Sequence, residues 1–293
     1  MNLRRLRTMV AIAEAPSFTA AGAALGLSHG AVSLHVKELE AELGVALVDR
    51  ARRPPVLTDR GAALVEHARR MLAIADEIAG LGSATALVGT LAVGIVPSAM
   101  AGLAPPALAA LRAAHPGLRL RIRTGLSADL ALMVRSGELD AALTTAPEAA
   151  IPGLRAREAA REPLEAIAPD SGGADAAQDA RALLQGRPFI WFSRRTWAGQ
   201  MIERRIEEMG LGVDAAMEVD SLEAVEALVR HGLGVSVAPR RAGAGRLGIR
   251  AAPLGDPPLW RALALLERHR NPRARLADAL LAAVQAAQQA TPR

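Results

Sequence analysis

Hydroxyl-bearing and basic residues gather in one short stretch near the start of the chain, within residues 17–40. Ser28 follows a glycine-containing break and is placed to cap a helix. Val32, Val36 and Leu39 then recur at the spacing of a buried helical stripe. This pattern is typical of a helix-turn-helix, which presents the early residues of its second helix to the edges of DNA bases. From this stretch we expect DNA contacts by Thr19, Ser28, His29, Gly30, Ser33, Leu34 and Lys37.

A second basic element follows the helix pair. Residues 45–48 and 56–57 form two short extended arms around an Arg- and Pro-rich tip, as in a wing. Wing tips contact the DNA backbone or the minor groove, so we expect contacts by Arg52, Arg53 and Pro54. Solvated surface charge is the alternative for these arginines. Residues 1–58 therefore predict a winged helix-turn-helix domain.

Four motifs follow one another in this region: the Ser17-Phe18-Thr19 run, Ser28-x-x-Ala31-Val32-Ser33, Leu39-Glu40-x-Glu42-Leu43-Gly44 and Leu57-Thr58-x-x-Gly61. With these motifs the first sixty or so residues resemble the N-terminal domain of the LysR-type transcriptional regulators. Family members commonly carry Gln-Pro where this chain has His29-Gly30, and Arg-Gln where it has Leu34-His35. The loss of that arginine removes a long donor able to bond guanine or phosphate. His29 and His35 lie at or near the expected DNA face. They are either partly protonated and contact DNA, or neutral histidines on the surface.

A long amphipathic helix is expected from about residue 59. Its apolar stripe is narrow and extends beyond a sixty-residue domain, so it needs a partner surface. The resemblance implies that two chains pair through this helix to form a homodimer, whereas a helix packed on its own domain is the alternative. Glycines near residues 80–89 suggest a hinge, so residues 59–89 form the linker. The stripe comprises Leu64, Ala68, Met71, Ala75 and Ile78.

From residue 90 onward strands and helices alternate, which predicts α/β architecture. Residues 90–293 resemble the LysR effector-binding module, which implies two lobes related to periplasmic binding proteins. The expected lobes are about 90–160 with 268–293, and about 161–267. The fold class is thus a multi-domain α+β chain. The motifs that carry the resemblance are Gly137-Glu138-Leu139-Asp140, Asp220-Ser221-x-x-Ala224 and Gly232-Leu233-Gly234-Val235.

Open α/β sheets bind ligands beyond the carboxyl ends of their strands, where hydroxyls and helix ends suit a small anion such as a carboxylate. Each Ser or Thr taken alone is better explained as a helix cap, but their convergence at one end of both lobes favours a ligand site. Arg194, with Arg195, is either a bidentate carboxylate clamp or surface charge. The expected effector-binding residues are Ser98, Ala99, Met100, Thr124, Ser127, Thr144, Thr145, Ser193, Arg194 and Ser221.

Enzymatic chemistry finds little support in the sequence. The 293 residues contain no Cys, and the six His show no metal-ligand spacing, so neither a metal nor a cofactor is expected. Gly26-x-Ser28-x-Gly30 matches the nucleophile elbow of hydrolases, but a helix is predicted before it where that motif needs a strand. Gly243-x-Gly245-x-x-Gly248 matches a dinucleotide fingerprint in letters, but prolines follow where a helix should begin.

We therefore expect a LysR-type DNA-binding transcriptional regulator that responds to a small-molecule effector bound between two lobes, and no enzyme. The alternative is a solute-binding protein without regulatory DNA binding. The formal charge of +5 is compatible with binding double-stranded DNA. Neither a signal peptide nor a membrane span is predicted, so the expected location is the cytoplasm. The resemblance further implies a homotetramer, a dimer of dimers, and contact with RNA polymerase.

Overall fold

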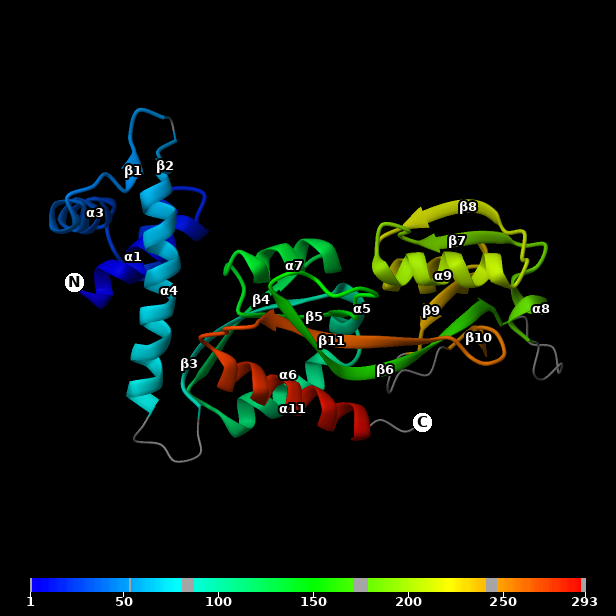
Figure 1. Ribbon diagram of the computed structural model, residues 1–293. Coiled ribbons are helices and arrows are strands. Elements are labelled where there is room, and N and C mark those ends of the chain that lie inside the picture. The colour runs from blue at the N-terminus through cyan, green and yellow to red at the C-terminus, as the bar shows by residue number, and fades with distance from the viewer. Residues whose placement is uncertain (1, 53, 81–86, 171–178, 241–246, 291–293) are drawn as a thin grey trace. The chain divides into compact units, whose positions relative to one another are not determined.

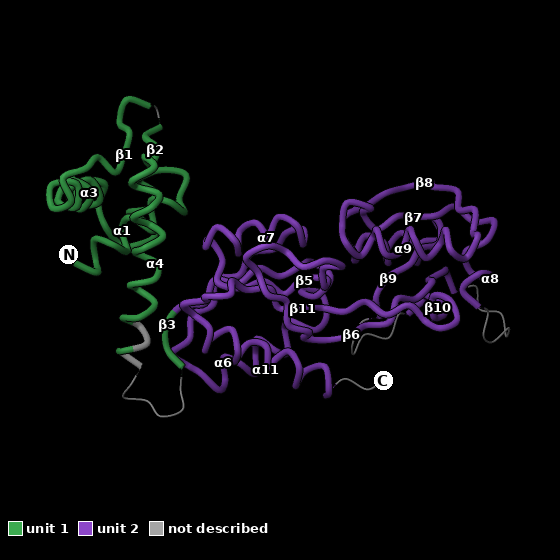
Figure 2. Tube along the Cα trace, in the orientation of Figure 1, with its two compact units in different colours: residues 1–89 green, residues 90–293 purple. Residues whose placement is uncertain are grey.

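The computed structural model of the protein describes residues 2–52, 54–80, 87–170, 179–240 and 247–290. The chain forms two compact units, residues 1–89 and residues 90–293, which are coloured separately in Figure 2. Each unit has its own hydrophobic core. Within the described residues, no helix is both long enough and apolar enough to cross a membrane.

The first unit is helical with a small two-stranded wing (Figure 1). The wing strands pair antiparallel, with Val48 opposite Leu57 and Asp49 opposite Val56. The elements in order are α1 (Leu3–Glu14), α2 (Phe18–Leu25), α3 (His29–Leu43), β1 (Val48–Asp49), β2 (Val56–Leu57) and α4 (Asp59–Gly80).

The core of the first unit is built on the helix-turn-helix. Val32, Val36 and Leu39 are fully buried, which confirms the stripe predicted for the second helix. The spacing of Leu3, Leu6, Val10 and Ala13 predicts one buried face on α1, but this is partly wrong, because Leu3 is exposed. That face instead buries side chains at a spacing of three residues, namely Leu6, Met9 and Ile12.

Helix α4 has two apolar sides. Val65, Ala68 and Leu72 pack into the core of their own unit. Along another side of the same helix run three side chains that the single chain leaves exposed: Met71 at 37%, Ile74 at 54% and Ile78 at 62%. A surface helix normally hides its apolar residues on one side only, and this second stripe has no covering partner among the residues that the structure describes.

The second unit is an α/β structure built on one seven-stranded sheet, whose order is β10-β6-β11-β5-β3-β4 with β9 also pairing with β6. Strands β7 and β8 form a separate parallel pair. The elements are β3 (Gly89–Ile95), α5 (Pro97–Met100), α6 (Ala104–Ala114), β4 (Leu118–Thr124), α7 (Ser127–Arg135), β5 (Ala141–Thr145), β6 (Leu154–Pro169), α8 (Ala180–Leu184), β7 (Pro188–Phe192), α9 (Trp197–Glu208), β8 (Asp214–Val219), α10 (Leu222–Arg230), β9 (Ser236–Pro239), β10 (Ile249–Pro253), β11 (Trp260–Arg268) and α11 (Ala274–Ala290).

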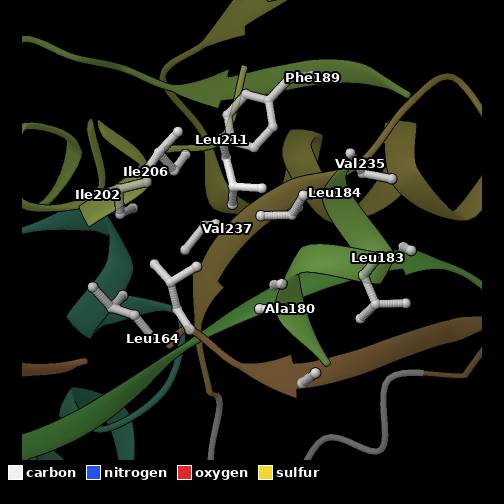
Figure 3. Packing of buried hydrophobic residues seen from close by; sticks show 14 of the residues in the cluster. Leu164, Ala180, Leu183, Leu184, Phe189, Ile202, Ile206, Leu211, Val235 and Val237 are labelled. Atoms are coloured by element: carbon white, nitrogen blue, oxygen red, sulfur yellow. The ribbon is translucent and has the colours of Figure 1, made fainter. Parts of the chain in front are cut away.

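Two long strands, β6 and β11, run through this unit (Figure 1). Residues 154–163 of β6 pair with β11, and residues 164–169 pair with β9 and β10. The strand therefore belongs first to the part of the sheet that holds β3 and β5, and then to the part beside β7 and β8. This second part has its own core, in which Leu164, Phe189 and Ile202 pack together (Figure 3).

Candidate functional site

The outward face of α3 is the first candidate site. Ser28 has an extended backbone, and its hydroxyl accepts a hydrogen bond from the backbone N–H of Ala31 at 3.2 Å, so it caps the helix. Gly26 ends α2 with a φ of 66°, a conformation that favours glycine. Because the buried stripe fixes the rotation of α3, the opposite face must point away from the core.

The predicted DNA contacts occupy this outward face. His29, Gly30 and Lys37 are exposed, as is Thr19 in the first turn of α2. Ser33 is half-buried, and Leu34 is 55% exposed. The structure thus brings donors, a hydroxyl and one large apolar side chain onto one helical surface.

His35 lies on a different side of α3. The hydroxyl of buried Thr8 donates to the carbonyl of Arg4 at 3.1 Å. The same hydroxyl lies 2.8 Å from Nδ1 of His35, within hydrogen-bonding distance. This contact ties α3 to α1, and no local pattern predicts it, because the two residues are 27 positions apart.

The wing is held to the recognition helix by Glu40. Its Oε1 accepts hydrogen bonds from the backbone N–H groups of Leu47 at 2.9 Å and Val48 at 3.2 Å. Its Oε2 pairs with Arg50 at 3.0 Å. Glu40 was part of a family motif in the sequence, but this role follows only from the coordinates.

The wing tip itself is exposed. Arg52 lies 3.5 Å from Asp49, and its side chain is largely solvent-accessible. Pro54 is also exposed, while Arg53 lies outside the described residues. The tip can therefore offer Arg52 to a phosphate.

The second candidate site lies where strands of the second unit end. Strands β3 and β5 are parallel, so Ser98 and Thr145, which stand at or just after their carboxyl ends, lie at the same edge of the sheet. The side chains of both are buried. The backbone N–H of Ala146 donates to the carbonyl of Ala262 in β11 at 2.8 Å, which places this edge beside β11.

A buried arginine completes this cluster. Arg261 of β11 is 1% exposed, and its Nη1 donates to the hydroxyl of Ser98 at 2.8 Å. Its Nη2 pairs with Glu162, which stands directly opposite on β6. Among the described residues, no acceptor lies within hydrogen-bonding distance of its Nε. Sequence reasoning missed both charged residues, although a lone Arg in an otherwise apolar strand is a recognisable signal.

The other predicted residues of this part have mixed environments. Ala99 is fully buried and Met100 half-buried, whereas Thr124 is exposed. Thr144 is fully buried, and its hydroxyl donates to the backbone carbonyl of Thr145 at 2.9 Å. Ser127 was expected to cap α7, but Leu126 occupies the cap position and Ser127 is the first residue inside the helix.

In the other part of the unit, Ser193 and Ser221 follow the parallel strands β7 and β8, and the N–H of Ser193 donates to the carbonyl of Val219. Ser221 caps α10 through the N–H of Ala224 at 3.2 Å. Ser193 is buried. Both seryl groups therefore stand at one edge of this strand pair, as expected from the sequence.

Arg194 is already engaged by its surroundings. Its guanidinium lies 5.3 Å from the centre of the Trp191 ring and within 3.5 Å of carboxylate oxygens of both Glu203 and Glu218. A clamp on a ligand would need to compete with these carboxylates. The geometry thus favours a structural role for Arg194.

One ion pair joins the two parts of the unit. Glu148, just beyond β5, accepts from Nη2 of Arg204 in α9 at 2.7 Å. This hydrogen bond, more than any other influence, raises the pKa of Arg204 above its ordinary value. Since both side chains are exposed, the pair is weak and can open without a large cost.

The fold and these two sites define a DNA-binding regulator with a separate ligand-binding unit. Residues 3–62 match the bacterial regulatory helix-turn-helix proteins of the lysR family, and residues 84–289 match the LysR substrate binding domain. The chain belongs to the LysR-type family of transcriptional regulators. The alternative of a solute-binding protein without regulatory DNA binding is not supported.

Relatives support this assignment across most of the chain. A RuBisCO operon transcriptional regulator from Allochromatium vinosum is 30% identical over 242 residues, which cover 81% of this chain and 79% of that protein. A probable hydrogen peroxide-inducible genes activator from Mycobacterium avium is 35% identical over 144 residues, and these span 48% of this chain and 46% of the relative. These relatives are regulators and not enzymes.

Solved structures agree with the fold. A full-length OxyR variant from Pseudomonas aeruginosa is 26% identical, with a TM-score of 0.69, and the alignment covers 97% of this chain and 98% of the other. A full-length LysG from Corynebacterium glutamicum with its effector Arg bound is 25% identical, with a TM-score of 0.59 and coverage of 97% and 98%.

Proposed function

We propose that this regulator binds double-stranded DNA through the outward face of α3 and the wing tip, as a dimer that pairs through α4. Helix α3 carries exposed donors above a fixed buried stripe, which suits major-groove contact. The exposed stripe of Met71, Ile74 and Ile78 offers α4 an apolar surface for a second copy. A tetramer formed from two such dimers, contact with RNA polymerase and a cytoplasmic location complete the proposal.

The effector is a small polar molecule that binds between the two parts of the second unit, at the cluster of Ser98, Thr145 and Arg261. The observation that carries this is the buried guanidinium of Arg261, whose Nε lacks an acceptor among the described residues. A buried hydrogen-bond donor without an acceptor raises the free energy of the folded state, and a ligand oxygen could accept its hydrogen bond. The hydroxyl of Ser98 can serve the same ligand.

Glu162 restricts which anions can bind at Arg261. It already neutralises Arg261, so an incoming carboxylate must displace Glu162 or bring a positive charge of its own. Glu162→Gln should therefore bind simple carboxylates more tightly than the wild type does. The chain also differs from any sensor that works by thiol oxidation, because its 293 residues contain no Cys.

A thermal-shift screen of small carboxylates, amino acids and aromatic acids tests the effector site. A ligand of the folded state raises the melting temperature with its concentration. Ser98→Ala should lose most of that shift, while Glu162→Gln should gain shift with simple carboxylates. A hit whose shift is the same in wild type, Ser98→Ala and Glu162→Gln would place the effector elsewhere.

DNA binding is tested separately with fluorescently labelled duplexes from the promoter region. Affinity should survive competitor DNA and should fall steeply as salt rises, since phosphate contacts release counterions. Lys37→Ala should weaken binding and flatten that salt dependence. An unchanged slope would remove Lys37 from the contacts.

A further inference from the structure

The recognition helix presents an apolar side chain where a polar contact would be expected. Between His29 and Lys37, a stretch that the structure describes in full, Leu34 is the one large apolar side chain that is exposed, at 55%. It lies outside the apolar cluster that forms the core of the first unit. A single exposed leucine is common on protein surfaces, so its position must carry the argument.

The neighbours of Leu34 leave it prominent on this face. Gly30, one turn before it, has no side chain, and the space where a Cβ would lie has only the hydroxyl of Ser28 nearby, at 3.9 Å. Glu38, one turn after it, is drawn to Arg5 of α1 at 2.8 Å. His35 is held by Thr8. Leu34 is therefore the largest apolar group that this face offers to a partner.

The chemistry of the major groove restricts what this side chain can contact favourably. Base edges there consist of hydrogen-bond donors and acceptors, with one apolar exception, the C5-methyl group of thymine. A leucine cannot satisfy donors or acceptors and would desolvate them at a cost. Only the thymine methyl gains from burial against it.

We propose that Leu34 contacts the C5-methyl group of a thymine in each half-site, so that this regulator selects a 5-methylpyrimidine at that position. The inference rests on the proposed docking of α3 in the major groove. It concerns a position where the sequence departs from the arginine that many family members carry. Where an arginine would donate a hydrogen bond to DNA, Leu34 of this helix would make an apolar contact.

The test compares thymine with uracil, which differ at C5 by the methyl group alone. Preferred sites are first selected with the full-length protein from a random duplex library. Each T of a selected site is then replaced singly by dU, and the affinities of wild type, Leu34→Ala, Leu34→Met and Lys37→Ala are measured by anisotropy.

One T per half-site should weaken wild-type binding by about 4-fold when replaced by dU, the factor that corresponds to about 0.8 kcal/mol for one buried methyl-sized group. Leu34→Ala should bind the thymine site more weakly and should be indifferent to dU at that position. Leu34→Met keeps an apolar side chain and should keep part of the discrimination. Lys37→Ala should lose affinity equally for both duplexes.

Two results would overturn the inference while leaving DNA binding intact. Wild-type protein that binds every dU duplex as well as the thymine duplex has no methyl contact. Leu34→Ala protein that keeps the full discrimination places the contact on another residue. Failure to select any site would instead refute the docking of α3, and the inference with it.

Discussion

Removing the buried guanidinium of Arg261 should destabilise the second unit. Arg261→Met leaves Glu162 facing the space of its lost partner and deprives Ser98 of its donor. Breaking a buried ion pair from one side costs about 3–5 kcal/mol. Glu162 keeps 13% of its side-chain surface, so water can reach it, and we expect the lower end, about 3 kcal/mol.

Urea unfolding of the full-length protein measures this change. All three tryptophans, Trp191, Trp197 and Trp260, lie in the second unit, so their fluorescence reports its unfolding selectively. With an m-value of about 2–3 kcal/mol/M, a loss of about 3 kcal/mol lowers the midpoint by about 1–1.5 M. The matched control is Arg161→Met, which removes an exposed arginine from the neighbouring strand β6 and should shift the midpoint only slightly, because its pair with Glu158 is exposed.

A double-mutant cycle isolates the pair itself. Replacing both charges, as in Arg261→Met with Glu162→Leu, removes the isolated buried charge that each single variant leaves. The double variant should therefore be less destabilised than the sum of the singles, by about 2 kcal/mol or more. A strictly additive double variant, or an Arg261→Met protein as stable as the control, would refute the reasoning.

Three further outcomes are expected. Gly61→Ala should destabilise the first unit by about 2 kcal/mol or more in a circular-dichroism melt, because its new Cβ would lie 2.1 Å from the carbonyl oxygen of Leu47; an unaltered melt contradicts this. Ile74→Asp should convert dimers to folded monomers in sedimentation, since Ile74 is exposed in the single chain; persistent dimers would exclude this stripe. The hydrogen bond from Arg161 lowers the pKa of Glu158, so its contribution to stability is present above pH 4.5 and is lost as pH falls through the lowered value. An NMR titration of the Arg161→Gln variant should show a higher pKa for Glu158 than in the wild type.

The sequence predicted the first unit well because its signals are local. A cap at Ser28, a stripe at 3–4 residue spacing and a glycine at the end of each helix specify the helix-turn-helix within thirty residues. The sequence does not predict the contacts between helices, such as the contact of His35 with Thr8. Those depend on distances that no periodicity encodes.

The second unit shows where local patterns fail. The alternation of apolar and basic residues over 118–123 predicts that Ile122 points inward, yet its side chain is 44% exposed. Strand β4 lies at the edge of the sheet, where burial is less complete than at its centre. The pattern after Pro97 predicts a single helix to about Ala114, but the structure has two, and the second begins at Ala104 with prolines in its first turn. The apolar run 139–143 predicts a strand, which the structure places at 141–145.

The sequence predicts an extended segment only over residues 164–168, whereas strand β6 runs from Leu154 to Pro169. Its earlier part carries alternating charges, a composition that indicates a surface loop. The structure explains the discrepancy, because Glu267 of β11 is fully buried and accepts from Arg155 at 3.0 Å while pairing with Arg157 at 2.7 Å. The charges of one strand are satisfied by a partner more than a hundred residues away.

The proposed effector site lies where this non-local pairing changes partners. Arg261 and Glu162 face each other where β6 leaves its pairing with β11 and, two residues later, begins its pairing with β9. Arg261 is the second residue of β11, and its side chain contacts both Ser98 and Glu162 of β6, so a change at Arg261 reaches both. A ligand that takes over a hydrogen bond of Arg261 must therefore alter the restraint on these strands. The free energy by which such a ligand changes DNA binding can be no larger than the difference between its binding free energies for the two conformations of the second unit.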